Sequence, residues 1–151
     1  MTVFQGIDGQ HAGNGETLTV KVLATKHKTT GVILNKIEIL SENEKKIVGR
    51  YKLKPETELI INAKGGVGMD GRKGSEKNPA GGKGGNGGNG GNITIIKDPS
   101  VTGLNIKVNN DGGKGGKGGP PYYANSQKGS DGNDGNGGNT TTQIAKVSLT
   151  F

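Results

Sequence analysis

The chain has 151 residues, the length of one ordinary domain, and we treat residues 1–151 as a single domain. Glycine contributes 31 residues, about a fifth of the chain where roughly 7% is usual, whereas hydrophobic residues make up 28% and aromatic residues 3%. This composition excludes a large side-chain core, and the lack of cysteine excludes disulfides and cysteine metal sites. The formal net charge of +7 favours an acidic partner, or alternatively keeps a glycine-rich surface soluble.

The first residues, 1–5, have neither the basic region nor the apolar stretch of a Sec signal peptide. No apolar run approaches the ~20 residues of a membrane span. We therefore expect no membrane span, and either a cytoplasmic location or a place in an exported or viral assembly.

Glycine recurs at every third position in five blocks, with Ala12 taking one glycine position of the first. The blocks cover residues 6–15, 65–74, 81–91, 112–119 and 129–138. Polyproline II geometry has three residues per turn, so glycine at every third position forms a helix edge without side chains. Collagen uses the same geometry but needs abundant proline, and this chain has 5 prolines. We predict a bundle of about five polyglycine II helices instead.

Between the glycine blocks, apolar and often β-branched residues alternate with polar ones, which is typical of half-buried strands. We predict strands over residues 17–22, 33–39, 47–53, 59–63, 92–97, 104–108 and 145–151. Residues 41–46 would form either one helical turn or a hairpin loop. The predicted fold is mostly β, with short antiparallel strands in a sandwich-like base that carries the polyglycine II bundle, and almost no α-helix.

The number of bare glycine edges predicts where each block lies. Blocks 81–91 and 112–119 repeat Gly-Gly-X, so they have two bare edges and belong in the interior, whereas the other three blocks have one and belong outside. The predicted interior glycines are Gly81, Gly82, Gly84, Gly85, Gly87, Gly88, Gly112, Gly113, Gly115, Gly116, Gly118 and Gly119. A bare edge on an outer block would let two copies pair, so a homo-oligomer stays an open alternative.

The remaining positions of the blocks are expected to point to solvent, Asn86, Asn89 and Asp131 among them. The cations at these positions form a candidate basic surface, made of Arg72, Lys73, Lys83, Lys114 and Lys117.

Catalytic and cofactor motifs find little support in the sequence. Residues 66–71 fit Gly-x-Gly-x-x-Gly, but no helix follows them, as a dinucleotide site requires. Asp131 and Asp134 resemble part of a calcium loop without its final bidentate acid, and His11 and His27 lack partner motifs. We predict no cofactor, no metal site and no enzymatic activity.

A candidate binding loop follows the second interior block, where the chain must turn. It consists of Pro120, Pro121, Tyr122, Tyr123 and Asn125. Exposed tyrosines stack well on sugars and bases, so the pair is a candidate contact for a ligand. The alternative is that the two rings merely cover the end of the bundle.

The run over residues 81–104, in which glycine triplets lead into a strand, then Asp98-Pro99 and Leu104, resembles the glycine-rich domain of the Obg GTPase family. That resemblance implies polyglycine II helices on a small β base and, if function carries over, contact with ribosomal RNA. The chain departs from the family after Gly15, where Glu-Thr-Leu-Thr-Val replaces a Phe-Arg-Arg-Glu-Lys-type segment, and no GTPase domain is present. A weaker likeness links it to polyglycine II adhesins at phage fibre tips.

These patterns predict a non-catalytic scaffold, a structural or adhesive surface module that displays loops to a glycan or protein partner. One alternative is a basic intracellular module that contacts ribosomal RNA. Another is a structural spacer without a ligand.

Overall fold

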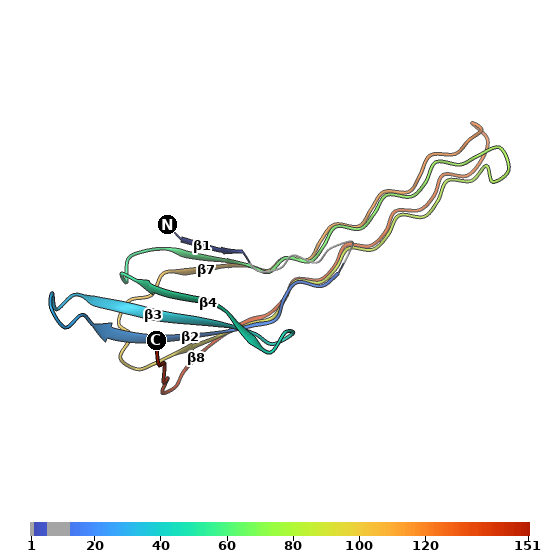
Figure 1. Ribbon diagram of the computed structural model, residues 1–151. Coiled ribbons are helices and arrows are strands. Elements are labelled where there is room, and N and C mark those ends of the chain that lie inside the picture. Colours follow the sequence, from blue (N-terminus) through green and yellow to red (C-terminus); the bar gives the residue numbers. More distant parts are fainter. Residues whose placement is uncertain (1, 6–12) are drawn as a thin grey trace.

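The computed structural model describes residues 2–5 and 13–151. They form a β base, where both chain ends lie, and a long stalk of glycine-rich segments that projects from it (Figure 1). Eight strands lie in the base, and the described residues include no α-helix. The prediction of a mostly β chain is confirmed.

Two sheets make up the base. A five-stranded mixed sheet has the order β4-β3-β2-β6-β8, and a three-stranded sheet has the order β1-β5-β7. The strands of the larger sheet are β2 (Leu18–Lys26), β3 (Ile33–Ser41), β4 (Lys46–Leu53), β6 (Ile93–Lys97) and β8 (Thr140–Ile144). Those of the smaller sheet are β1 (Thr2–Gln5), β5 (Leu59–Asn62) and β7 (Ile106–Asn109).

Most strand pairs are parallel, which corrects the prediction of an antiparallel base. Among the described strands, only β2–β3 and β3–β4 pair antiparallel, whereas β1–β5, β5–β7, β2–β6 and β6–β8 are parallel. The cause is the path of the chain. β5 and β7 each leave the smaller sheet for the stalk, and the chain returns each time into the larger sheet as β6 or β8. β5 and β7 therefore run in the same direction, as do β6 and β8.

One hydrophobic cluster joins the two sheets. It includes Leu18, Val20, Val22, Ile37, Ile39, Ile93 and Ile95 of the larger sheet and Leu59, Ile61 and Ala63 from β5 and the residue after it. The predicted alternation places these side chains on the inner face. Asn35 interrupts the pattern in β3, yet it is buried because its Nδ2 donates to the Gly103 carbonyl at 2.7 Å.

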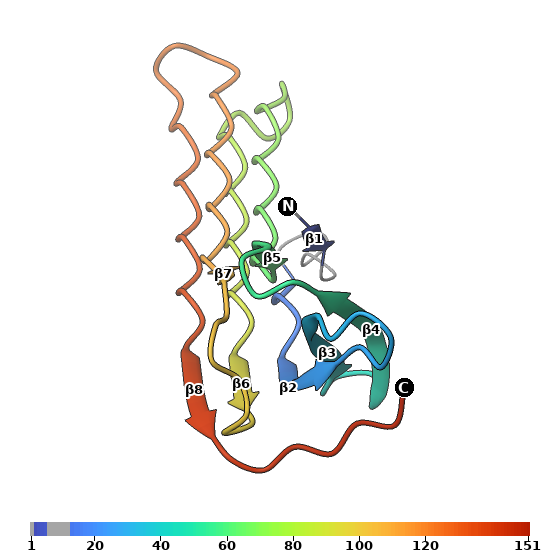
Figure 2. The same cartoon turned by 90° about the vertical axis from the view of Figure 1, so that its left-hand side faces the viewer.

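The chain end departs from the prediction of a strand over residues 145–151. The last strand is β8, and the residues after it are irregular and run across to β3 and β4, where the Phe151 ring lies near Lys36 and Arg50 (Figure 2). β6 ends at Lys97, before Asp98 and Pro99, so a longer β8 would find no further strand partner. Residues 42–45 are a hairpin turn, the second alternative for that segment.

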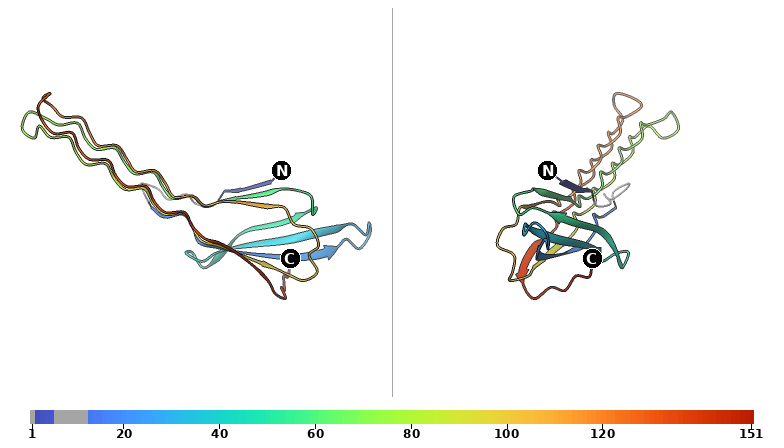
Figure 3. Two further views of the ribbon diagram at one scale, coloured as in Figure 1. Left: turned by 180° about the vertical axis from the view of Figure 1, so that it is seen from behind. Right: turned by 60° about the vertical axis from the view of Figure 1, so that its left-hand side comes forward.

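The stalk consists of two outgoing segments, residues 63–74 and 110–120, and two returning segments, residues 80–92 and 127–139 (Figure 3). Their backbone N–H groups donate to neighbouring segments at every third residue. The bonds between the outgoing segments run from Gly65 to Asp111, Gly68 to Lys114, Gly71 to Lys117 and Gly74 to Pro120, with N···O distances of 2.7–2.9 Å. The same three-residue interval recurs between the other bonded segments.

The four long segments differ in their number of neighbours. Residues 80–92 and 110–120 each hydrogen-bond to the other three long segments, whereas residues 63–74 and 127–139 each bond to two of them. A Cβ atom added at Gly84 would overlap the backbone of residues 116 and 117. The segments are therefore too close for any side chain along their shared edges.

The predicted first block, residues 6–15, lies mostly outside the described residues, as does His11. Its described end is bonded into the stalk, because Gly15 donates to the Asn89 carbonyl at 2.7 Å and the Gly13 carbonyl accepts from Gly66 at 2.9 Å.

Candidate binding site at the tip of the stalk

The far end of the stalk consists of two loops that are tied together. The first joins residues 74 and 80, and it closes through a bond from the Ser75 N–H to the Asn78 carbonyl at 2.8 Å. The second, residues 120–127, follows the outgoing segment 110–120. A bond of 2.8 Å from the Tyr122 N–H to the Pro79 carbonyl links the two loops.

The candidate binding loop presents two adjacent exposed aromatic rings at this end. Tyr122 and Tyr123 are 47% and 45% exposed. Their ring centroids lie 4.7 Å apart with an angle of 88° between the planes, an edge-to-face pair. Asn125 is exposed in the same loop, and Pro121 is half-buried. The edge-to-face pairing orients the two rings differently toward solvent.

Along the stalk, side-chain oxygens accept backbone N–H groups of the next segment, which sequence reasoning missed. We call this series the side-chain ladder. Its Asn steps are Asn86 to Asn133, Asn89 to Asn136 and Asn92 to Asn139, with O···N distances of 2.8–2.9 Å. Its Asp steps are Asp70 to Lys117, Asp131 to Gly118 and Asp134 to Gly115, at 2.7–2.8 Å. These side chains were expected only to point to solvent, and they instead satisfy donors that glycine edges leave free.

Near the tip the side-chain ladder changes from acceptors to cations. Three residues nearer the tip than Asp70, Asn86 and Asp131, the corresponding positions are occupied by Lys73, Lys83 and Lys128. Backbone bonds join Arg72, Gly82, Gly119 and Gly129 in one level across the stalk. Each of the three lysines directly follows or precedes a residue of that level, so they surround the stalk just below the loops.

The structure thus divides the predicted basic surface. Arg72, Lys73 and Lys83 lie at the tip with Lys128, which the prediction omitted. Lys114 lies nearer the base, where its Nζ is 3.5 Å from Asp134 Oδ2, and the Lys117 N–H is held by Asp70. Lys128 could have been found from the spacing of Asp131 and Asp134, since it continues their three-residue interval.

The two aspartates that resembled a calcium loop serve the backbone instead. The N–H of Gly118 holds the pKa of Asp131 below its usual range, and nearby Lys128 and Lys117 act in the same direction. The N–H of Gly115 and then Lys114 lower the pKa of Asp134. Within the described part of the chain, no group of three or more potential metal-ligating residues occurs.

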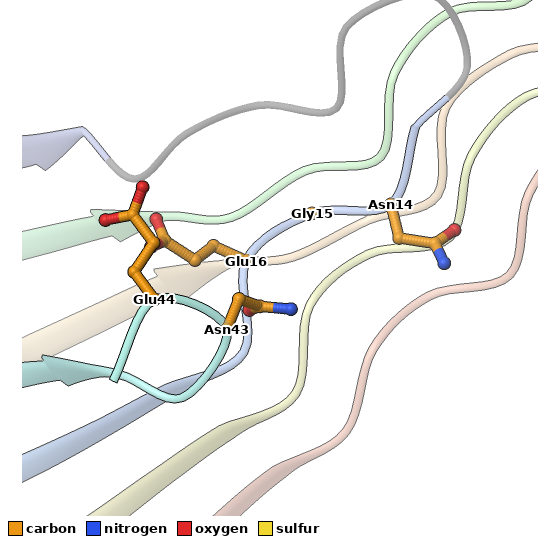
Figure 4. Close-up of a pocket in the computed structure, with 5 residues that line it drawn as sticks. All are labelled: Asn14, Gly15, Glu16, Asn43 and Glu44. Atoms are coloured by element: carbon orange, nitrogen blue, oxygen red, sulfur yellow. The ribbon is translucent and has the colours of Figure 1, made fainter. Parts of the chain in front are cut away.

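A hollow of about 210 Å³ lies where the stalk meets the base, and Figure 4 shows its lining. Asn43 Oδ1 accepts the Thr17 N–H at 2.8 Å, and Asn14 Oδ1 accepts the Asn89 N–H at 3.0 Å. The carboxylates of Glu16 and Glu44 complete the lining, and Glu44 pairs with Lys46 at 3.5 Å. These contacts join the β3–β4 turn to the stalk, and the lining offers no nucleophile with a neighbouring base.

No protein-family model matches the chain, and neither does any curated protein or any solved structure. The resemblance of residues 81–104 to the Obg glycine-rich domain therefore stays a prediction. Among the described residues, no helix is long and apolar enough to cross a membrane.

Proposed function

We propose that this chain is a non-catalytic binding module whose tip loops contact a glycan or protein partner. The observation that carries the proposal is the exposed pair of Tyr122 and Tyr123 at the far end of the stalk. Large aromatic rings are usually placed where they bury area, in a core or at an interface. Two of the chain's 3 tyrosines belong instead to the loop of residues 120–127 at the far end of the stalk (Figure 1), where a partner would cover them.

In this proposal the four stalk segments are polyglycine II helices, with residues 13–16 as the described end of a fifth, and the two facing sheets are a sandwich-like base. Supporting evidence is the three-residue interval of the backbone bonds, which equals the three residues per turn of polyproline II geometry. At a rise of ~3.1 Å per residue, twelve residues would extend about 35 Å. Such a stalk separates the tip from the base.

The stalk also makes the tip suitable for binding because it orders the loops in advance. Gly74 and Gly81, at the two ends of the first loop, donate to the carbonyls of Pro120 and Gln127 of the second at 2.9 Å. Loops that are already ordered lose less conformational entropy when a ligand binds, so a small surface suffices for measurable affinity.

A glycan array tests this proposal, with the Tyr122→Ala/Tyr123→Ala double variant beside the unmodified chain. We expect array binding that weakens at least about tenfold in the double variant, because hot-spot aromatic residues contribute roughly 2 kcal/mol or more. Ile144→Ala is the matched control, since Ile144 is 70% exposed but lies on β8 in the base. Absence of any glycan or protein ligand would favour the ligand-free spacer. Equal binding by the double variant and by Ile144→Ala would show that the tyrosines do not contact the ligand.

One observation favours RNA as a second candidate partner, namely the cations beside the tyrosines. Arg72, Lys73, Lys83 and Lys128 lie just below the two rings, and RNA-binding surfaces combine phosphate-binding cations with aromatic stacking. Binding of RNA through these cations would weaken steeply between 50 and 200 mM salt, as roughly one ion is released per phosphate contact. Binding that is insensitive to salt would contradict this alternative.

A further inference from the structure

One N–H group at the tip lacks the acceptor that the side-chain ladder provides elsewhere. Between the returning segments, Asn86, Asn89 and Asn92 each accept the N–H of the residue 47 positions later. The next step toward the tip pairs Lys83 with Ser130, and a lysine side chain has no acceptor atom. The Ser130 carbonyl accepts the Gly84 N–H at 2.9 Å, whereas the N–H of Ser130 has no acceptor among the described residues.

The steps of the side-chain ladder that contain Lys73 and Lys128 differ from the Lys83–Ser130 step, because they lack a free backbone donor. Three residues beyond the pair Asp70–Lys117, Lys73 lies opposite Pro120. Three residues beyond the pair Asp131–Gly118, Lys128 lies opposite Pro121. Proline has no backbone N–H, so neither step needs an acceptor. Of these three lysine steps, the one between Lys83 and Ser130 therefore combines a cation with a free backbone donor.

A hollow surrounds this donor. Its volume is about 310 Å³, and it is lined by Ala80, Gly81, Lys83, Gln127, Lys128, Gly129 and Ser130. The donors available to a ligand include two ammonium groups, the Ser130 hydroxyl and the Ser130 N–H, and the lining includes no carboxylate. The nearest acid in sequence, Asp131, is engaged by the Gly118 N–H at 2.7 Å in a different groove.

We propose that this hollow binds the sulfate or carboxylate group of an acidic glycan, an inference that rests on the function proposed above. One anionic oxygen takes the place of the absent asparagine oxygen and accepts the Ser130 N–H, while Lys83 and Lys128 neutralise the charge. Charge-assisted bonds of this kind are about twice as strong as neutral ones. Ala80 links the hollow to Pro79, whose carbonyl holds Tyr122, so a sugar bound here adjoins the tyrosine pair.

The geometry favours a glycan over RNA. Binding of single-stranded RNA uses successive bases stacked on aromatic faces and a cationic groove that follows several phosphates. Tyr122 and Tyr123 are nearly perpendicular, so they do not form two parallel platforms. The hollow is lined by two short stretches, within residues 80–83 and 127–130, and this length suits one anionic substituent beside one sugar ring.

The decisive variant is Lys83→Asn, which places an asparagine at the vacant step of the side-chain ladder. Its side-chain oxygen is expected to accept the Ser130 N–H, as Asn86 does for Asn133, and so to close the site without disturbing the stalk. The matched control is Lys77→Asn, which removes the same charge from the first tip loop outside the hollow. A second variant, Ser130→Pro, removes both the N–H and the hydroxyl of Ser130 and keeps both lysines, with Pro120 and Pro121 as precedents at neighbouring steps.

The first measurement is a titration of the folded chain with inorganic sulfate, followed by amide NMR. We expect a saturable shift of the Ser130 amide resonance that Lys77→Asn preserves within about twofold in affinity. Lys83→Asn and Ser130→Pro should each weaken sulfate binding at least tenfold, and in Ser130→Pro the binding is followed at the amides of Gly129 and Asp131 because proline has no N–H. An unmoved Ser130 resonance, or equal losses in Lys77→Asn and Lys83→Asn, would overturn the proposal.

The second measurement identifies the source of the anion. The probes are a heparin tetrasaccharide, a hyaluronan tetrasaccharide, neutral dextran and poly(U), each with the unmodified chain and Lys83→Asn. Tighter binding of either acidic sugar, lost at least tenfold in Lys83→Asn, supports the proposal. Equal binding of neutral dextran by both chains overturns it while leaving the proposed function intact, and tightest binding of poly(U) replaces the glycan with RNA. Sulfate binding at Ser130 without any glycan ligand would overturn the assignment to a glycan, and only the absence of a protein ligand as well would refute the proposed function.

Discussion

The base and the stalk of this molecule are held together by different forces. In the base, side chains such as Leu18, Ile39 and Ile61 are fully buried between two sheets, so burial of apolar area provides most of the stability. In the stalk, the backbones themselves touch, and hydrogen bonds at every third residue replace side-chain packing. The base should therefore tolerate changes of side-chain shape, whereas the stalk should tolerate no added side chain along its shared edges.

The largest effect is expected from Gly84→Val, because its side chain would overlap the backbone at Gly116. Separating the segments there would break at least three bonds, those donated by Gly84, Gly116 and Gly132. At about 1 kcal/mol per bond, the free energy of unfolding should fall by at least about 3 kcal/mol. Thermal or denaturant unfolding, with amide exchange of the stalk glycines, measures this loss.

Two controls separate this effect from a general sensitivity to substitution. Gly137→Ala should be nearly neutral, since a Cβ there meets only the Asn110 carbonyl at 4.0 Å. Leu104→Ala, at a half-buried position beside the core of the base, should cost about 2 kcal/mol. If Leu104→Ala were as damaging as Gly84→Val, the stalk would not depend on close backbone contact.

Local sequence patterns predicted most elements of both regions but not how they pair. The alternation in residues 17–22 and 33–39 predicted β2 and β3, because period two directly reports a half-buried strand. The directions of the parallel strands could not be predicted, since they depend on which sheet the chain re-enters after each passage along the stalk. β1 was missed for the same reason, as residues 2–5 are a strand only beside β5.

The error at the chain end has a similar cause. Residues 145–151 alternate more clearly than Thr140–Ile144, yet the latter form β8. Pairing in the stalk continues directly into the sheet, because Ile93 pairs with Thr140 at the same 47-residue spacing as Asn92 and Asn139. That continued pairing, not hydrophobic alternation, selects the strand.

The sequence likewise indicated one part of the candidate site and not the other. The tyrosine pair was apparent because residue type alone indicates it. The acceptor roles of Asn86 and Asp131, and the vacant position at Ser130, depend on the pairing between segments, which no single block reveals. A signal was nevertheless present, since asparagine recurs at every third position both in residues 86–92 and in residues 133–139.

A moderate effect is expected from Asn86→Ala, which tests whether side chains stabilise the stalk at all. The change removes the oxygen that accepts the Asn133 N–H at 2.9 Å, so the free energy of unfolding should fall by about 1 kcal/mol. Hydrogen exchange of the Asn133 amide should accelerate, while Asn125→Ala, in the exposed tip loop, leaves it unchanged. Unaltered exchange in Asn86→Ala would show that backbone bonds alone hold this groove.

The aspartates of the stalk and the base should make the stability of the two regions depend on pH. Their replacement in the stalk has the smallest expected effect at neutral pH and becomes informative at acidic pH. Asp131 and Asp134 have lowered pKa values because the N–H groups of Gly118 and Gly115 favour their charged forms. Asp98 in the base also has a lowered pKa, since the N–H groups of Val147 and Ser100 donate to it. A carboxyl group whose pKa is lower in the folded state stabilises that state above its unfolded pKa of roughly 3.9. That contribution is lost as the pH falls from there through the folded pKa.

The two regions should respond differently when their aspartates are replaced by asparagine. Asp131 and Asp134 each use one oxygen for a backbone donor, so the double Asp131→Asn/Asp134→Asn variant keeps an acceptor at both positions and no longer titrates. Its stability should fall slightly at pH 7, where the two charges stabilise the unmodified chain, and should depend less on pH below about 4. Asp98 uses Oδ1 for Ser100 and Oδ2 for Val147, both at 2.9 Å, and asparagine offers only one oxygen. Asp98→Asn should therefore destabilise the base at pH 7, and less so as the pH falls and Asp98 itself becomes protonated, as thermal unfolding from pH 3 to 7 and the Val147 amide exchange rate would show. A pH profile of the double variant identical to that of the unmodified chain would mean that the charges of Asp131 and Asp134 add nothing to the stalk, and that only their oxygen positions matter.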